Sequence, residues 1–312
     1  MRQGIVIVGS YNVGLFLKGE RIPKVAETLI GTEFFEGGGG KGSNQAVAAA
    51  KLGGDVRFVG RIGCDRYAQD ALATYARLGI STDYVFRDET THTGISVILI
   101  DAQGNNSIMV VPGANYRLST ADVDRAAPLF ENCAWAGFQL ENERDVVLHG
   151  IRRAHAAGAR VLLDPAPARA LPDDVYPCID VIKPNEVEAA TLSGIEVTDF
   201  ASAERACDWF LARGVKTAIV TLGARGAVAR DASGTRTFRT PRLPGPAVDS
   251  TGAGDTFSGA LLAGLSRNVA LDEAIRLAIA ASSLSVTRPG VIESIPTREE
   301  TENLLMDKEA WQ

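Results

Sequence analysis

A carboxylate follows directly after a flexible glycine turn in the segment VDSTGAGDTFSGAL, residues 248–261. Apolar residues recur at helical spacing after Asp255, so we expect a helix to begin at this aspartate. The Gly-Ala-Gly turn in front of it leaves backbone N–H groups without partners and lets another molecule approach closely. These N–H groups and the positive end of the helix dipole favour an anion. The segment therefore predicts either a phosphoryl-transfer site with Asp255 at its edge or a simple helix cap.

A second glycine-rich segment, GGGGKGSNQA at residues 37–46, could bring backbone close to a ligand while Lys41 and Asn44 donate hydrogen bonds to it. It is not a Walker A motif, which would need glycine in place of Phe35 and serine or threonine in place of Gly42. The first strand also lacks the second glycine of a Rossmann fingerprint. Two common nucleotide-binding folds are thereby disfavoured, and a flexible turn before a helix remains the alternative for this segment.

Two further segments each have a binding and a structural interpretation. In KPNEVE, residues 183–188, Asn185 and Glu188 are three apart at an expected helix start, where they would form a capping box. The same side chains could instead project toward phosphates and hold a hydrated Mg²⁺, which takes few protein ligands. TLGARGA, residues 221–227, follows an expected strand and could lie under a nucleotide or form a hairpin turn.

Other polar residues that might do chemistry have structural interpretations. Asp164 and Arg169, in the segment DPAPAR, end a strand next to two prolines and are expected to be structural or to lie at the rim of a site. The histidines, His92, His149 and His155, share no motif with one another and are expected to be surface or helix residues. The sequence therefore does not favour a Ser-His-Asp or Cys-His mechanism.

The composition argues against several classes of protein. Of 312 residues, 46% are hydrophobic and 22% are charged, which is ordinary for a soluble globular protein. The formal net charge of −6, without a Lys/Arg cluster, argues against a nucleic-acid surface. The four cysteines are far apart in sequence, so we expect neither a disulfide framework nor a zinc site, and a reducing, cytoplasmic location fits. Neither a signal peptide nor a membrane span is expected.

The elements that would position these motifs alternate between strands and helices. We expect strands at 5–9, 56–60, 160–164, 180–184 and 217–223, and helices at 43–53, 68–79, 143–157, 201–214, 255–267 and 270–287, the last two of which close the chain. This alternation predicts an α/β fold, a doubly wound and mostly parallel sheet with helices on both faces. No linker divides the chain, so a single domain is expected.

One region interrupts the alternation. Residues 93–115 form two strand-like runs around a Gly-Asn-Asn turn, which predicts an antiparallel hairpin. Residues 15–36 are also rich in strand and turn signals. Together they predict a small β-sheet that emerges from the main domain and serves as a lid over a site, as an edge for dimer pairing, or as both.

The order of the motifs resembles that of the ribokinase-like family of carbohydrate kinases. The glycine-rich turn with Lys and Asn is followed by DPAP, KPNE, TLG and finally DSTGAGDTF, and the resemblance runs from GIVIVGS to VTRPGV, nearly the whole chain. It implies one domain over residues 1–312, with lid segments at about 12–40 and 92–115 that are often shared across a homodimer. It also implies transfer of the ATP γ-phosphate to a hydroxymethyl group of a small sugar.

The resemblance assigns roles at the acceptor side of the site. Asp255 would be the general base on the sugar hydroxyl, and the anion hole would be formed by Gly252, Ala253 and Gly254. Besides Asp255, the sugar-binding positions would be Asn12, Gly14, Gly40, Lys41, Asn44 and Glu141.

The resemblance also assigns residues to ATP and to two ions. ATP would contact Asn185, the loop from Thr221 through Gly223 to Gly226, and Gly254. Mg²⁺ would be organised indirectly by Asn185 and Glu188. A monovalent cation such as K⁺ would be surrounded, mostly by backbone carbonyls, at Asp249, Thr251, Ser285, Arg288, Gly290 and Ser294.

Gly14 departs from the family pattern, because ribokinases have at this position the aspartate of an N-x-D motif that grips the sugar hydroxyls. The missing side chain would open space and remove a negative charge. We therefore expect an acceptor other than simple D-ribose, one that is bulkier, differently oxygenated or anionic, unless a neighbouring residue or water restores the contact. A kinase of a nucleoside, sugar acid or ketose is an alternative. A non-catalytic sugar- or nucleotide-binding regulator is another, although Asp255 favours an enzyme.

Overall fold

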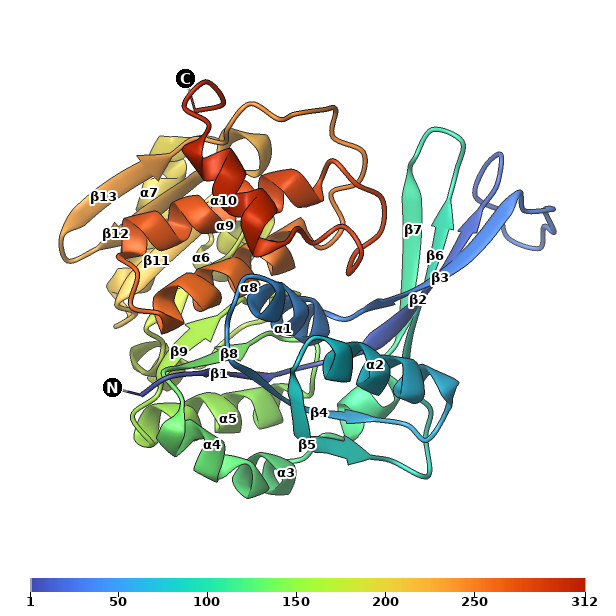
Figure 1. Cartoon of the computed structure of the whole chain (residues 1–312), viewed down its shortest axis with the longest axis horizontal. Coiled ribbons are helices and arrows are strands. Elements are labelled where there is room, and N and C mark those ends of the chain that lie inside the picture. The colour runs from blue at the N-terminus through green and yellow to red at the C-terminus, as the bar shows by residue number, and fades with distance from the viewer. Residues whose placement is uncertain (1, 312) are drawn as a thin grey trace.

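A nine-stranded sheet forms the centre of the molecule (Figure 1). The structure, a computed structural model, describes residues 2–311, so the first and last residues of the expected domain lie outside the description. In order across the sheet, the strands are β13 (Gly234–Phe238), β12 (Ala227–Asp231), β11 (Thr217–Thr221), β10 (Val181–Ile182), β9 (Arg160–Leu163), β8 (Trp135–Phe138), β1 (Ile5–Val8), β4 (Val56–Ile62) and β5 (Ser81–Arg87). Neighbours from β11 to β5 are parallel, whereas β12 and β13 continue the sheet as an antiparallel hairpin.

Both faces of this sheet are covered by helices, as the apolar sequence of its central strand requires. In β1, Ile5 and Ile7 belong to one hydrophobic core, and Val6 and Val8 belong to the core on the opposite face. The first core includes residues of α1 (Lys41–Lys51), α2 (Arg66–Arg77), α8 (Ala253–Ser266) and α9 (Leu271–Ser285). The second includes residues of α3 (Thr120–Arg125), α4 (Ala127–Asn132), α5 (Arg144–Ala156), α6 (Glu186–Ser193) and α7 (Phe200–Leu211). The predicted doubly wound α/β fold is confirmed.

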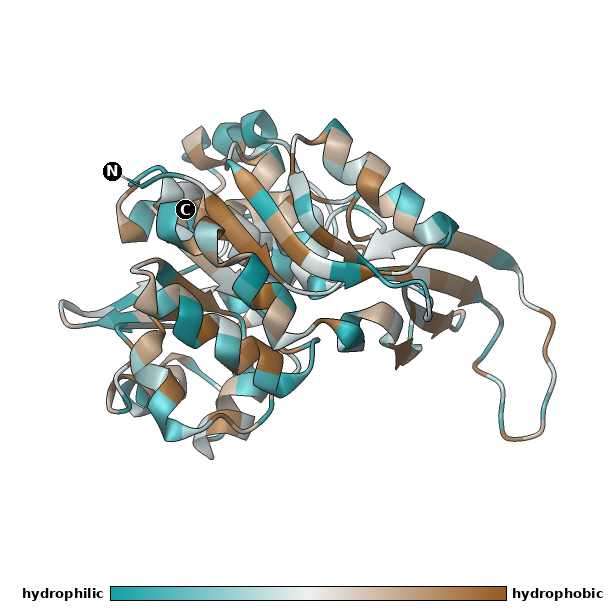
Figure 2. Ribbon diagram, turned by 90° about the horizontal axis from the view of Figure 1, so that it is seen from below, coloured by the Kyte–Doolittle hydropathy of each residue, from teal (hydrophilic) through white to brown (hydrophobic). Residues whose placement is uncertain are grey.

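A second, four-stranded sheet extends from the side of the molecule (Figures 1 and 2). Its order is β3 (Glu33–Gly39), β2 (Asn12–Lys18), β6 (Gly94–Ile100) and β7 (Asn106–Val111). β6 and β7 are the expected antiparallel hairpin, and β2 joins them by pairing in parallel with β6. We call this element the small sheet. Its strand β2 follows β1 after a short connection, so the small sheet begins at the carboxyl end of the central strand.

The strand order changes direction at β1, because β4 and β5 lie on one side of it and β8 to β11 lie on the other. In open α/β sheets, ligands bind outside the carboxyl ends of the strands at such a switch point. The fold alone therefore places a ligand site next to Gly9 and Ser10, which directly follow β1.

The helices α1 and α8 pack closely together at this end of the sheet, because glycines remove the side chains between them. A Cβ atom at Gly259 would lie 2.5 Å from the carbonyl oxygen of Gln45 and 2.6 Å from Cβ of Ala48. A Cβ atom at Gly42 would lie 2.7 Å from Cα of Gly9, so α1 also rests on the end of β1. The two glycine-rich segments of the sequence thus become the adjacent N-termini of two packed helices.

The end of the chain differs from the expectation that two helices close it. A third helix, α10 (Arg298–Met306), begins with a capping box between Thr297 and Glu300 and packs on α9 through Leu304. Its buried face is narrow, with Thr301 and Leu304 as its buried residues, so the apolar periodicity that indicated the other helices is weak here.

Two findings concern the cysteines and the apolar character of the helices. All four cysteines, Cys64, Cys133, Cys178 and Cys207, are free. Within residues 2–311, no helix has the length and apolar character needed to cross a membrane.

Candidate active site

Asp255 lies in the first turn of α8 and its side chain is buried and held by two amides of α1. Asn44 Nδ2 donates to Asp255 Oδ2 over 2.8 Å, and Gln45 Nε2 donates a longer bond of 3.4 Å to Oδ1. Burial raises the pKa of the Asp255 carboxyl above its ordinary value, while the ammonium of Lys41 opposes this increase. The result is a fixed carboxylate that is a stronger base than an exposed aspartate.

The turn before Asp255 has the backbone that an anion site requires. Gly252 precedes α8 in the left-handed conformation, with φ of 75°, and the helix start has no side-chain cap. A Cβ atom at Gly252 would lie 2.7 Å from Cγ1 of Val291, so glycine is required here for both backbone conformation and space. The Ala253 N–H donates to the carbonyl oxygen of Ser250 at 3.2 Å, so the N–H groups that this turn leaves for a ligand are those of Gly252 and Gly254.

Lys183 is a site residue that the sequence analysis missed. Its side chain is 3% exposed, and its Nζ lies 2.9 Å from Oδ2 of Asp164 and 3.0 Å from the carbonyl oxygen of Gly254. It belongs to KPNEVE, where only the capping pair had attracted attention. Lys183 and Gly254 are 71 positions apart in the sequence, so only the fold shows that they are in contact.

Asp164 is buried beneath the site and does not lie at its rim. Its Oδ2 also accepts hydrogen bonds from Gln45 Nε2 at 3.0 Å and Ser258 Oγ at 2.9 Å. Its other oxygen, Oδ1, is buried and has no hydrogen-bond partner. Arg169, by contrast, is partly exposed and donates to the hydroxyl of Tyr116.

The residues expected to bind a sugar meet where β1, β2 and α1 join. Glu141 Oε2 accepts hydrogen bonds from Ser10 Oγ at 2.5 Å and from the backbone N–H of Lys41 at 2.9 Å. The pKa of the Lys41 ammonium is raised, mainly by the negative charge of Asp255, so Lys41 remains charged. At Gly40, φ is 87°, and a Cβ atom there would lie 2.7 Å from the backbone nitrogen of Asn12.

Asn115 supports Asn12 and was not identified from the sequence. Its Nδ2 donates to Oδ1 of Asn12 at 2.9 Å and to the carbonyl oxygen of Tyr11 at 2.9 Å. Its Oδ1 accepts from the Tyr11 N–H at 3.0 Å, so both sides of this buried amide are used. Asn12 is thereby fixed in orientation by a residue 103 positions away.

The expectation that Gly14 opens space is wrong. A Cβ atom at Gly14 would lie 2.6 Å from Cε2 and 3.1 Å from Cζ of Phe16. Residues two apart on a strand lie on the same face, and the aromatic ring of Phe16 has folded back over the glycine. The missing aspartate has thus been replaced by an aromatic surface and not by an empty volume.

A cavity of about 440 Å³ lies beside the N-terminus of α8 and has the size of a ligand pocket. All five residues expected to bind the nucleotide line it: Asn185, Thr221, Gly223, Gly226 and Gly254. Phe257 and Val286 add apolar surface to its wall. The TLGARGA segment thus contributes to this wall and also leads into the hairpin of β12 and β13.

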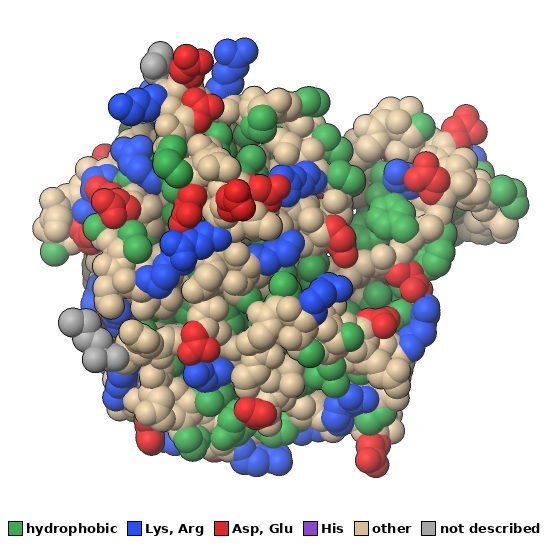
Figure 3. Space-filling view, viewed as in Figure 1, with side chains coloured by type: hydrophobic (Ala, Val, Ile, Leu, Met, Phe, Trp, Pro, Cys, Tyr) green, Lys and Arg blue, Asp and Glu red, His purple; other side chains and the backbone are tan. Residues whose placement is uncertain are grey.

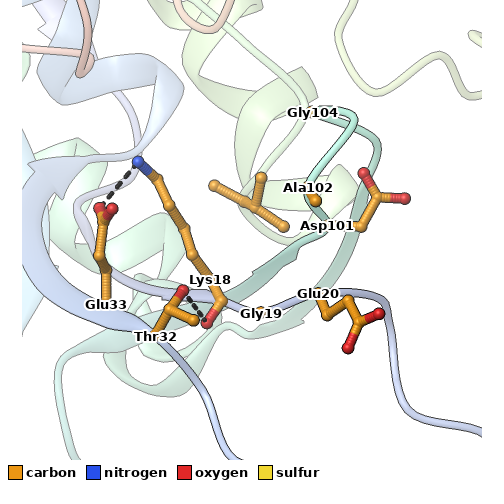
Figure 4. Close-up of a pocket in the computed structure, with 9 residues that line it drawn as sticks. Lys18, Gly19, Glu20, Thr32, Glu33, Asp101, Ala102 and Gly104 are labelled. Atoms are coloured by element: carbon orange, nitrogen blue, oxygen red, sulfur yellow. Dashed lines mark hydrogen bonds and ion pairs between the residues drawn. The ribbon is translucent and has the colours of Figure 1, made fainter.

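A separate hollow of about 410 Å³ lies on the small sheet, around Lys18, Thr32 and Asp101 (Figure 4). Lys18 Nζ lies 2.9 Å from an oxygen of Glu33, and both side chains are largely exposed. None of the expected site residues lines this hollow, so it is separate from the expected site.

Asn185 and Glu188 form the capping box that the sequence allowed. Asn185 Oδ1 accepts from the Glu188 N–H at 2.8 Å, and Glu188 Oε2 accepts from the Asn185 N–H at 2.9 Å. Burial, followed by the charge of Asp164, raises the pKa of Glu188, whereas Lys183 lowers it. The capping interpretation is therefore confirmed, and the same glutamate lies within the electrostatic reach of the buried Asp164–Lys183 pair.

The segments expected around a monovalent cation lie side by side. The N–H groups of Val248 and Asp249 both donate to the carbonyl oxygen of Val286, and Ser294 Oγ donates to Val291. The side chain of Arg288 pairs with Glu300 on α10, with Arg288 Nη2 2.6 Å from Glu300 Oε1. The positive charge of Arg288 is thus balanced by a carboxylate of α10. Thr251, Ser285 and Gly290 complete the expected set in the same two segments.

Comparisons with known proteins agree on one family. The profile described as pfkB family carbohydrate kinase matches residues 2–298. A ribokinase of Haemophilus influenzae is 37% identical and covers 96% of this chain and 98% of its own length. A deoxyribokinase of Salmonella typhi is 36% identical, with 95% and 96% covered. The structure of Arabidopsis thaliana ribokinase complexed with ribose and ATP has a TM-score of 0.90 at 31% identity, covering 98% of this chain and 99% of that one.

The Lys183–Asp164 pair leads to a prediction about stability. In Lys183→Met, the Asp164 carboxylate stays buried without its cation, and breaking a buried pair in this way costs about 3–5 kcal/mol. We expect this loss in the free energy of unfolding, measured by urea denaturation. Adding Asp164→Asn should recover most of it, because the remaining amide carries no charge.

The matched control is Arg298→Met, which removes the cation of an exposed pair with Glu302 and should cost less than about 1 kcal/mol. A Lys183→Met protein as stable as the wild type would contradict the assignment of Lys183 as the required counter-ion of Asp164.

Proposed function

Because the chain belongs to the pfkB family of carbohydrate kinases and is an ATP-dependent sugar kinase, we propose that Asp255 is its general base. The observation that carries the proposal is the buried carboxylate fixed by Asn44 at the open N-terminus of α8. A binding protein without activity would not need a base at this point. The family membership likewise argues against the regulator that the sequence had left open.

The proposed reaction is an in-line transfer. Asp255 takes the proton of the acceptor hydroxyl as its oxygen forms a bond to the γ-phosphorus of ATP. The bond from that phosphorus to the β–γ bridging oxygen breaks, and ADP leaves. The N–H groups of Gly252 and Gly254 are placed to receive the charge that spreads over the transferring oxygens, while the Ala253 N–H donates to the carbonyl oxygen of Ser250. The ammonium groups of Lys41 and Lys183 add positive charge on either side of this turn.

We further propose that Mg²⁺ accompanies ATP at the side of the site formed by Asn185 and Glu188. The residues present fit such an ion, because Glu188 is a partly buried carboxylate and Asp164 Oδ1 is a buried oxygen without a partner. Among residues 2–311, no three acidic, histidine or cysteine side chains form a ready-made metal cluster. A hydrated ion that takes few protein ligands is consistent with this arrangement. Bound there, Mg²⁺ would neutralise phosphate charge.

Replacement of the base gives the first test. In Asp255→Asn, the side chain can still accept a hydrogen bond from Asn44 but takes no proton, so kcat should fall by a factor of about 10² to 10⁴. ATP affinity should stay nearly unchanged, because the residues that line the nucleotide cavity are intact. An assay of ADP release and a direct ATP titration measure the two quantities.

Asp272→Asn is the matched control, since Asp272 lies in the first turn of α9 and its partly exposed side chain pairs with Arg236. It should retain wild-type kcat. If Asp255→Asn keeps more than about a tenth of wild-type kcat, Asp255 is not the general base.

We also propose that K⁺ binds between the segments 249–251 and 285–294. The proposal rests on two observations. The segments contact each other through their backbones, and the Arg288 guanidinium pairs with Glu300, so it does not supply the positive charge in place of K⁺. The ion would order the turn before α8 without contacting the sugar. Its position so close to Gly252 and Val291 makes the anion site sensitive to it.

The cation proposal predicts a salt effect on rate. Activity should be higher in K⁺ or NH₄⁺ than in tetramethylammonium at the same ionic strength, because the bulky ion does not fit among carbonyl oxygens. Initial rates at saturating sugar and ATP measure this difference. Equal rates in all three salts would refute the site.

We propose that two copies of the chain associate through the small sheet. Hydrophobic side chains gather on this sheet (Figure 3), and those of Ile108, Met109 and Val110 on its edge strand β7 are 55%, 71% and 48% exposed. An edge strand has unpaired backbone N–H and C=O groups that can pair with another strand, and a second copy of the chain would cover the apolar side chains of β7. The small sheet would then serve both predicted roles, because β2 also carries Asn12.

Light scattering tests the dimer. We expect a molar mass of twice 33.0 kDa for the wild type and of a single chain for Ile108→Lys with Val110→Lys, which charges one face of β7. A wild type that remains a single chain at micromolar concentration would rule out this interface.

A further inference from the structure

Phe16 occupies the place from which a side chain at position 14 would reach the site. A Cβ atom at Gly14 would meet Cε2 of Phe16 at 2.6 Å and Cδ1 of Ile98 at 3.4 Å. The first distance is shorter than any ordinary carbon contact, so a larger residue at position 14 requires the ring to move. The position of the Phe16 ring therefore depends on glycine at position 14.

The ring of Phe16 is not free to move. It is 8% exposed and stacks on Phe35 of β3, with ring centroids 4.6 Å apart and planes 6° apart. It also forms one buried apolar cluster with Ile98 and Val291. Such stacking adds stabilisation beyond the area that the rings bury, so the ring position is well defined.

This apolar cluster borders the reacting centre. Cγ1 of Val291 lies 2.7 Å from the place of a Cβ atom at Gly252, the residue that begins the anion site. On the other side, Phe16 lies on the same face of β2 as Asn12, the strand's polar residue at the junction with α1. A ligand held between Asn12 and the start of α8 therefore has the cluster as its wall.

We propose that Phe16, made possible by Gly14, is a specificity-determining residue that selects an acceptor sugar with hydrogen in place of a hydroxyl at the carbon facing β2. The inference rests on the proposed sugar site and narrows its substrate class to deoxypentoses. A hydroxyl pressed against Phe16, Ile98 and Val291 would lose its hydrogen bonds to water without replacement, whereas a methylene group would gain apolar contact. The expected discrimination is about tenfold or more in kcat/KM.

The experiment compares D-ribose with 2-deoxy-D-ribose and 3-deoxy-D-ribose, which differ from it by a single oxygen. Wild type should prefer one of the deoxy sugars to ribose. Phe16→Leu and Phe16→Ala should reduce that preference, mainly through KM, because the wall is smaller and water can reach the hydroxyl. Phe200→Ala, at the start of α7, is the matched control and should leave the preference unchanged.

The pairing of the two positions adds a double-variant test. Gly14→Asp alone should lose activity toward every sugar, because its side chain meets the Phe16 ring. Gly14→Asp with Phe16→Ala should instead gain ribose activity, because a carboxylate with room around it can accept hydrogen bonds from sugar hydroxyls. The gain should exceed the sum of the single effects.

The outcomes separate the inference from the function on which it rests. A wild type that prefers ribose to both deoxy sugars, or an unchanged preference in Phe16→Leu and Phe16→Ala, would overturn the inference and leave the kinase site standing. A wild type that binds ATP and phosphorylates no sugar in a broad panel would overturn both.

Discussion

The hydrogen bond between Asn44 and Asp255 is the contact on which the site depends, because it joins the N-termini of two helices that are far apart in sequence. It forms only because α1 and α8 approach closely, and that approach requires glycine at position 259. Gly42 sets the other side of α1 against the end of β1. The glycine-rich segments thus determine helix packing as well as ligand access. A larger side chain at either position would separate the base from the amides that orient it.

Charge balance is the second constraint. Asp255 and Asp164 are buried close together, and the charge of Asp164 contributes to raising the pKa of both Asp255 and Glu188. Lys41 and Lys183 supply the opposing charge within the same volume. Lys41 opposes the increase in the pKa of Asp255, Lys183 opposes that of Glu188, and neither lysine lines the cavity beside α8. A phosphate-binding site in which acidic side chains predominate needs such fixed cations, since helix N–H groups carry only partial charge.

The sequence predicted the parts of this site that depend on local signals. Glycines before a helical pattern located Asp255, a capping box located Asn185 and Glu188, and the alternation of strands and helices indicated the fold. Contacts between distant segments carry no local signal, which is why Lys183 and Asn115 were missed and Asp164 could be described only as structural or at the rim of a site. Gly14 shows the same limit. The sequence revealed the missing carboxylate, but only the packing of Phe16 on Phe35 shows what replaced it.

The proposed reaction centre and the proposed selectivity residues belong to different parts of the fold. Asp255 and the proposed anion site lie on helices packed on the main sheet, whereas Gly14 and Phe16 belong to a strand of the small sheet. The two parts meet through Val291, which contacts the start of α8 on one side and the Phe16 cluster on the other. Under these proposals, changes on β2 would alter which acceptor fits without moving Asp255, because the amides that hold Asp255 come from α1. Such a separation would let one phosphoryl-transfer site serve acceptors that differ by a single hydroxyl.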